Sequence, residues 1–143
     1  CLDACRLFAA ILLAALDGAD KATVLIGPHA VLAGGQSLGP KLQSIAAGAY
    51  RAKSVDEIRG SGYVVDSLEA ALWSFWHTDS FRDAILTAVN LGDDADTTAA
   101  VCGQVAGAFY GESAIPGHWR KQLVMQQEIR SLADQLQIHK TDA

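Results

Sequence analysis

The segment NLGDDADTTAAVCGQVAGAFYG (residues 90–111) joins a cluster of acids to a long run of small and apolar residues. Asp93, Asp94 and Asp96 lie within four positions, and the uncharged stretch 97–111 follows them directly. The composition of this stretch predicts a helix over residues 96–109. Negative charge is therefore concentrated at the point where a buried helix is expected to begin.

Small residues mark one face of this predicted helix. Ala99, Gly103 and Gly107 recur at four-residue intervals and so lie on the same side. A glycine inside a helix costs roughly 1 kcal/mol relative to alanine. Two such glycines on one face indicate that another helix approaches closely there, which would hold the preceding acidic segment rigidly.

The acids themselves have two interpretations, and their spacing leaves both open. In a loop that enters a helix, the Asp94 and Asp96 carboxylates and the Thr97 hydroxyl can converge as three oxygen ligands for Mg²⁺, Mn²⁺ or Ca²⁺. Gly92 would let the backbone turn sharply just before them. Alternatively, these residues are ordinary N-caps, favoured by the helix dipole by roughly 0.3–1 kcal/mol each. One acid is enough for a cap, and a bound cation would offset the repulsion among three.

The rest of the chain predicts an all-α fold of six or seven helices in a single domain, residues 1–143. Residues 2–17 are apolar nearly all round and predict a buried interior helix. Residues 27–39 are rich in turn-forming Gly and Pro and predict a loop. Apolar spacing near 3.6 residues and helix-forming composition predict further helices over 20–26, 40–50, 67–76, 80–89 and 119–137. The expected N-caps are Ser54, either Asp66 or Ser67, and either Asp79 or Ser80.

Composition excludes several classes of function. The 143 residues are 50% apolar and 19% charged, with a formal net charge of -5 and no basic run, which argues against nucleic-acid binding. The longest apolar run, residues 7–16, is too short to span a bilayer, so we expect a cytoplasmic protein without membrane contact. Cys1, Cys5 and Cys102 form neither a disulfide-like nor a zinc-like pattern, and all three are expected to be buried apolar side chains.

Three segments together resemble the C-terminal portion of the ADP-ribosylglycohydrolase family, of the dinitrogenase-reductase-activating glycohydrolase type. They cover nearly the whole chain in the family's order: CLDACRLFAAILLAAL (1–16), GYVVDSLEAALWSF (62–75) and NLGDDADTTAAVCGQVAGAFYGESAIPGHW (90–119). The resemblance implies a compact all-α bundle that holds two divalent cations, usually Mg²⁺ or Mn²⁺. It also implies a metal-dependent hydrolase that cleaves the bond between ADP-ribose and an acceptor, either a protein side chain or a small ADP-ribose conjugate.

Within this resemblance, Asp94, Asp96 and Thr97 match the C-terminal metal ligands, and Asp94 and Asp96 match the catalytic acids. The family's N-terminal glycine-rich segment and Thr-Asp-Asp cluster, which supply the other ligands, have no counterpart in this sequence. The chain is therefore expected to lack the N-terminal helices and half of the two-metal centre. We also expect an exposed apolar face where those helices belong. Either an N-terminal partner fragment or an incompletely recorded sequence would account for the missing half of the centre.

The same resemblance suggests residues for substrate binding. Gly62, Tyr63 and Val64 match a loop that approaches the ADP-ribose pocket. Asn90 and Gly92 would shape the acidic loop, and Asp93 would face solvent or lie outside the coordination shell.

Other classes of function remain as alternatives. The chain could be a non-catalytic ADP-ribose-binding or structural relative, or an inactive fragment that needs its N-terminal half. It could also be a helical interaction module whose acids only cap helices. The intact Asp-x-Asp-Thr sequence argues against simple loss of the metal site.

Overall fold

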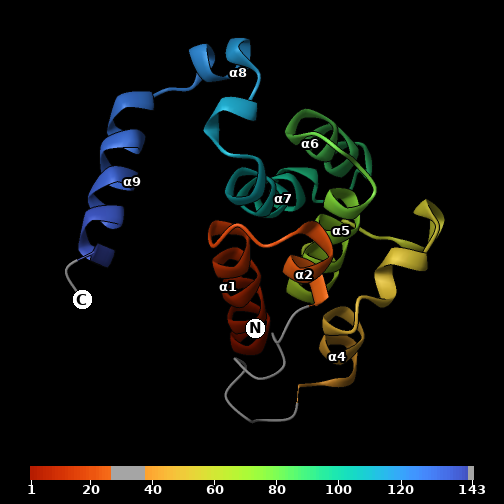
Figure 1. Cartoon of the computed structure of the whole chain (residues 1–143). Coiled ribbons are helices and arrows are strands. Elements are labelled where there is room, and N and C mark those ends of the chain that lie inside the picture. Colours follow the sequence, from red (N-terminus) through yellow and green to blue (C-terminus); the bar gives the residue numbers. More distant parts are fainter. Residues whose placement is uncertain (27–37, 142–143) are drawn as a thin grey trace.

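The protein is described by a computed structural model that covers residues 1–26 and 38–141 (Figure 1). Within these ranges the secondary structure consists of eight α-helices and three short 3₁₀-helices, without a strand. The prediction of an all-α fold is confirmed. The loop expected over residues 27–39 falls almost entirely outside the described residues.

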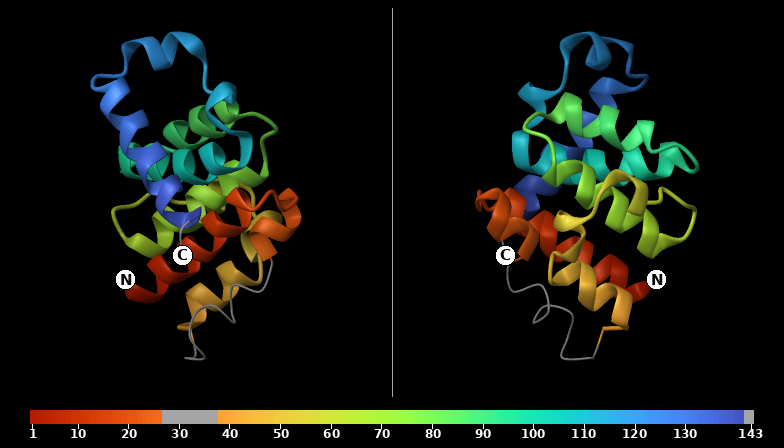
Figure 2. Two further views of the ribbon diagram at one scale, coloured as in Figure 1. Left: turned by 60° about the vertical axis from the view of Figure 1, so that its left-hand side comes forward. Right: turned by 90° about the vertical axis from the view of Figure 1, so that its right-hand side faces the viewer.

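A central helix, α7, organises the bundle. It packs against three other helices: α7 (Ala95–Tyr110) contacts α1 (Leu2–Leu16), α5 (Val64–Trp76) and α6 (Phe81–Asn90) (Figure 2). A Cβ atom added at Gly103 would meet Ile85 Cδ1 of α6 at 3.4 Å, and one added at Gly107 would meet Phe81 Cε2 at 3.9 Å. The prediction that another helix approaches the glycine face of residues 96–109 is therefore confirmed, and the partner is α6.

The start of α5 differs from the expectation. The helix begins at Val64, three residues before the expected start, and its N-cap is Tyr63. Asp66 and Ser67 are therefore not caps: the Asp66 carboxylate accepts a hydrogen bond from Ser61 Oγ at 3.0 Å, and the buried Ser67 hydroxyl donates to the Ser61 carbonyl at 2.5 Å. Val64 and Val65 are β-branched and have low helix propensity, so the sequence pattern did not predict this first turn.

The segment before α5 is more broken than predicted. The helix expected over 40–50 ends early as α4 (Pro40–Ala46), because Gly48 adopts a left-handed φ of 74°. Two 3₁₀-helices follow: η1 (Ala49–Ala52) and η2 (Val55–Glu57). The predicted Ser54 cap is confirmed, since Ser54 and Glu57 form a reciprocal capping box. The short helix expected over 20–26 is also confirmed, as α2 (Lys21–Ile26).

The C-terminal helix is two helices. The pattern over 119–137 predicted one helix, but the chain forms α8 (Gly117–Gln122) and α9 (Gln126–Thr141) there. A short 3₁₀-helix, η3 (Glu112–Ala114), precedes them. The break lies at Met125, whose φ of 60° is left-handed and interrupts the helical backbone. Figure 1 shows that α9 stands apart from the helical body.

Helix α6 begins as predicted, with Ser80 accepting a hydrogen bond from Asp83 N at 3.0 Å.

Helix α1 matches the predicted bounds but not the predicted burial. Leu7 and Ile11 are fully buried against the core, yet Leu2 and Leu16 are 63% and 64% exposed. The prediction of three buried cysteines is correct only for Cys102, because Cys1 and Cys5 are exposed at the start of α1. Among the described residues, no helix combines the length and hydropathy needed to cross a membrane.

The three thiols should therefore react very differently. Burial raises the pKa of the Cys102 thiol to about 12, so at about pH 8 it carries almost no reactive thiolate. We expect a disulfide reagent to label Cys1 and Cys5 rapidly in the native protein and Cys102 only after unfolding. A Cys1→Ser/Cys5→Ser variant should retain one slow thiol. Rapid labelling of that thiol under native conditions would show that α7 is not closed against α6.

Candidate metal site

The acidic loop connects α6 to α7 through two left-handed residues. Gly92 has a φ of 74° and Asp93 a φ of 56°. Glycine adopts this conformation without strain, and aspartate is one of the few other residues that tolerate it. The turn reverses the chain after Asn90 and places Asp94 at the N-cap position of α7.

Asp94 is the N-cap residue of α7, but its carboxylate does not cap this helix. Its side chain makes no capping hydrogen bond, whereas its backbone carbonyl accepts from Thr98 N at 3.1 Å. The Asp94 amide donates to the Gly60 carbonyl at 2.7 Å, which anchors the loop to the segment before α5. Backbone groups thus fix this residue, and its carboxylate remains available for another ligand. This geometry disfavours the interpretation of the acids as simple N-caps.

Asp96 lies next to Asp94 in space. A hydrogen bond with the Asp94 carboxyl and a second from Thr97 N at 2.9 Å lower the pKa of Asp96. Asp96 and Thr97 are exposed and Asp94 is half-buried, so the three oxygen-bearing side chains face solvent from one helix entrance. Two carboxylates at such close range repel one another unless a proton or a cation lies between them.

These residues fit part of a divalent-metal coordination shell. Carboxylate and hydroxyl oxygens are the donors that Mg²⁺ and Mn²⁺ prefer, and Mg²⁺ takes six of them. In the described part of the chain, no group of three or more His, Cys, Asp or Glu side chains could hold a metal ion by itself. The donor set of Asp94, Asp96 and Thr97 is therefore chemically suitable but incomplete.

Two residues that sequence reasoning missed position this loop. Thr98 is fully buried, and its hydroxyl has no hydrogen-bond partner among the described residues. A Cβ atom added at Gly60 would lie 3.0 Å from Thr98 Oγ1 and 3.2 Å from the Gly92 carbonyl. The missing side chain at Gly60 thus lets the segment before α5 lie close against α7 without a tight contact. The two glycines of the sequence Gly60-Ser61-Gly62 indicate that another backbone segment approaches closely, but the sequence does not identify that segment.

The segment predicted to approach an ADP-ribose pocket lies beside the acids. A Cβ atom added at Gly62 would lie 3.3 Å from Asp94 Oδ2, so Gly62 borders the acidic cluster directly. Gly62, Val64 and Thr97 all line one pocket of about 270 Å³ between α1, α5 and α7. Tyr63 is 53% exposed, and its ring lies under the Lys41 ammonium at 5.2 Å. The exposed Asn90 is farther along the chain, at the end of α6.

Comparison with known proteins gives consistent matches over part of their length. The ADP-ribosylarginine hydrolase Tri1 of Pseudomonas putida is 50% identical over 135 residues, which are 94% of this chain and 35% of that protein. Tri1 of Serratia proteamaculans is 61% identical over 92 residues, 64% of this chain and 25% of that protein. The ADP-ribosyl-[dinitrogen reductase] glycohydrolase of Rhodospirillum rubrum is 41% identical over 80 residues, 54% of this chain and 27% of that protein.

A solved structure shows the same arrangement of helices. An ADP-ribosylglycohydrolase-related protein complex contains a chain with a TM-score of 0.81 and 40% identity, matched over 92% of this chain and 44% of that one. This chain thus spans less than half the length of the relatives it matches. The model of the ADP-ribosylglycohydrolase family matches residues 1–142. The all-α helix arrangement, the acidic loop before α7 and this match lead to one conclusion: the chain belongs to the ADP-ribosylglycohydrolase family.

Proposed function

We propose that this chain supplies one half of the metal centre of a hydrolase that removes ADP-ribose from arginine side chains. The observation that carries the proposal is the Asp94 carboxylate, which lies at the N-cap of α7 without capping it and contacts Asp96. The arginine acceptor is favoured by the two relatives named ADP-ribosylarginine hydrolases, at 50% and 61% identity.

The chain's own residues would hold the cation in defined ways. Asp94 and Asp96 would bind it through carboxylate oxygens and Thr97 through its hydroxyl. A metal ligand must be deprotonated, so a cation would replace the proton of the hydrogen bond between the Asp94 and Asp96 carboxyl groups. A bound Mg²⁺ or Mn²⁺ would polarise a ribose hydroxyl or a water molecule and offset diphosphate charge. The remaining oxygen ligands would come from groups outside this acidic loop.

The substrate would lie against the segment that precedes α5. Gly62 leaves room beside Asp94 Oδ2, where a side chain would crowd the acids. Tyr63 presents an exposed ring that suits contact with a flat group, and Val64 lines the adjoining pocket. Gly92 and Asn90 would keep the acidic loop in its turn. The bond from the ribose anomeric carbon to the guanidinium nitrogen would break with oxocarbenium-like character.

A chimera provides the test of this function. The segment of the Pseudomonas putida relative that aligns with this chain would be replaced by residues 1–143, and Mn²⁺- or Mg²⁺-dependent release of ADP-ribose from ADP-ribosylated arginine measured. We expect turnover, and we expect Asp94→Asn and Asp96→Asn each to lose more activity than the roughly 10–100-fold caused by losing a group outside the coordination shell.

Asp93→Asn is the matched control, because asparagine also tolerates the left-handed backbone and the exposed Asp93 is not a proposed ligand. Its chimera should keep nearly full activity. Equal losses in all three variants would mean that net charge, not coordination, matters. A chimera that binds ADP-ribose with Mn²⁺ but does not release it would instead identify a non-catalytic relative.

Gly60→Ala tests whether the loop is held as described. The added methyl would collide with the Gly92 carbonyl and Thr98 Oγ1, so we expect the free energy of unfolding in urea to fall by roughly 1–3 kcal/mol. Hydrogen exchange at the Asp94 amide should also accelerate, because its bond to the Gly60 carbonyl lengthens. Gly117→Ala is the control, since nothing lies within 4 Å of its added Cβ. Unchanged stability and exchange in Gly60→Ala would refute the docking of this loop.

A further inference from the structure

Residues 61–63, here called the substrate segment, are held by hydrogen bonds from the first turn of α5. The Ser67 hydroxyl donates to the Ser61 carbonyl at 2.5 Å and lies 3.4 Å from the Tyr63 carbonyl. The Ser61 hydroxyl donates to the Asp66 carboxylate at 3.0 Å and accepts from Tyr63 N at 3.3 Å. Side chains that bond nearby backbone groups in this way fix a turn locally. The backbone of the substrate segment is therefore set by α5.

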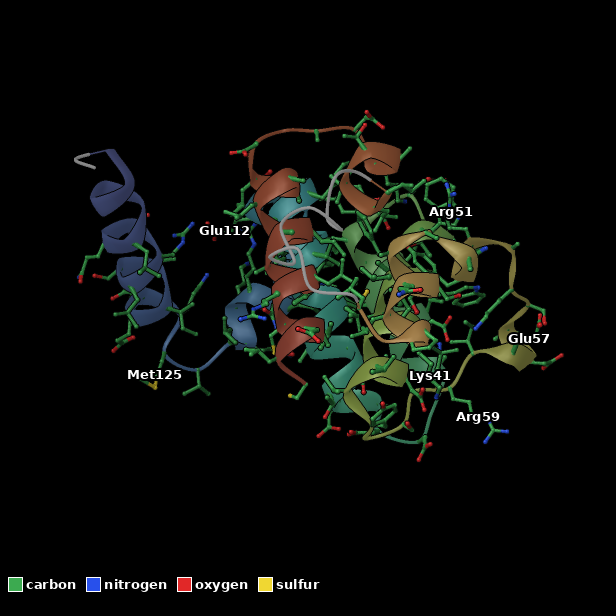
Figure 3. The ribbon with its side chains drawn as sticks, turned by 90° about the horizontal axis from the view of Figure 1, so that it is seen from below. Lys41, Arg51, Glu57, Arg59, Glu112 and Met125 are labelled. Atoms are coloured by element: carbon green, nitrogen blue, oxygen red, sulfur yellow. The ribbon has the colours of Figure 1, made fainter. Side chains whose placement is uncertain are left out.

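Lys41 of α4 contacts the same segment from a different helix. Its ammonium lies 5.2 Å from the centre of the Tyr63 ring and 3.4 Å from Asp66 Oδ1. The other carboxylate oxygen of Asp66 accepts the Ser61 hydroxyl, so one carboxylate joins Lys41 to the backbone turn. Figure 3, seen from below, shows Lys41 on the side of the helical body away from α9. A cation over one face of a ring occupies that face, so Tyr63 offers its opposite face to a flat group.

Two ion pairs bridge a hollow of about 190 Å³ between α4 and α5. Lys41 pairs with Asp66 at 3.4 Å. Lys53, which follows η1, pairs with Glu69 at 2.6 Å. The Lys53 pair is the more buried, with side-chain exposures of 31% and 18%, whereas the Lys41 side chain is 69% exposed. Exposed ion pairs add little to the stability of a fold. Lys41 therefore serves the fold less than Lys53 does, and its contact with the Tyr63 ring gives it a different role.

The orientation of Tyr63 matters because the substrate segment borders the acids. A Cβ atom added at Gly62 would lie 3.3 Å from Asp94 Oδ2, and Tyr63 follows Gly62 directly. The Tyr63 ring is 53% exposed and would have many orientations open to it without a contact that holds it. A ring that is already oriented loses less conformational freedom when a ligand binds. A residue that orients Tyr63 would thus strengthen ligand binding without touching the bond that breaks.

We propose that Lys41 is a positioning residue for the substrate, which acts by holding the Tyr63 ring so that its free face meets a flat group such as the adenine of an ADP-ribosyl ligand. The contacts that carry the proposal are those of the Lys41 ammonium with the Tyr63 ring and with the Asp66 carboxylate. The proposal rests on the proposed function for the identity of the ligand, but the contact between Lys41 and Tyr63 does not depend on it.

The first test measures the Kd of ADP-ribose with Mn²⁺ by calorimetry, and the KM and kcat of turnover, in the chimera. Lys41→Met should raise Kd and KM roughly 2- to 5-fold, as expected for the loss of an exposed cation–π contact, and leave kcat unchanged. Lys41→Arg should bind like the wild type, because a guanidinium also lies well over an aromatic face. Lys53→Met is the matched control, since it removes an ion pair across the same hollow. It should lower the melting temperature without changing Kd or KM.

A double-mutant cycle with Tyr63→Leu shows whether Lys41 acts through the ring. In the Tyr63→Leu background, Lys41→Met should not raise Kd further, because the ring that it holds is gone. A full additional loss there would mean that Lys41 contacts the ligand itself, for example at a phosphate, and would overturn the proposal. Equal losses in Lys41→Met and Lys53→Met would also overturn it, since they would assign both lysines to the stability of the fold.

The 143-residue chain by itself gives a readout that requires no activity. The NMR signals of the Tyr63 ring, assigned by their loss in Tyr63→Leu, should shift in Lys41→Met and stay in place in Lys53→Met. An unchanged ring signal in Lys41→Met would refute the contact and the proposal, whatever the chimera does. A shifted ring signal together with a chimera that neither binds nor releases ADP-ribose would refute the proposed function and the ligand named here, while the contact of Lys41 with Tyr63 would stand.

Discussion

The position of the acidic loop depends on how closely α7 can approach its neighbours. At Gly103 an added Cβ would meet Ile85 Cδ1 of α6 at 3.4 Å, an ordinary van der Waals contact, so the two helices are already close at this glycine. Glycine inside a helix costs roughly 1 kcal/mol in propensity, and the cost is offset by the buried contact that it permits. Because α7 is held this firmly, its first turn has a fixed position relative to α5 and α1.

At the N-terminus of α7, a close contact again depends on a glycine, which has no side chain. The Gly60 carbonyl reaches the Asp94 amide at 2.7 Å because no Cβ separates the two segments. This contact satisfies the backbone amide of the N-cap residue itself, whereas an N-cap side chain would accept from an amide of the first turn. The Asp94 side chain makes no such capping hydrogen bond. Gly60 therefore fixes the position of Asp94 through the backbone, separately from what its carboxylate does.

Features that depend on neighbouring residues could be predicted from the sequence, whereas features that depend on distant residues could not. Helices α1, α2, α6 and α7 were found because apolar spacing and nearby caps such as Ser80 are local signals. The breaks were missed because Gly48 and Met125 interrupt otherwise continuous patterns through single left-handed residues. Likewise, the acids are adjacent in sequence and were found, whereas Gly60 acts on them across more than thirty positions through its backbone carbonyl.

The burial of α1 is the most informative mismatch between sequence and structure. Its pattern predicts a helix buried on all sides, and the described chain buries one side only. A hydrophobic pattern reflects the surroundings for which a sequence is suited, so an uncovered apolar face indicates surroundings larger than the described residues. The pocket beside this face is also lined by Thr97, which follows Asp94 and Asp96 at the start of α7. Uncovered apolar surface and the two carboxylates proposed as metal ligands thus adjoin.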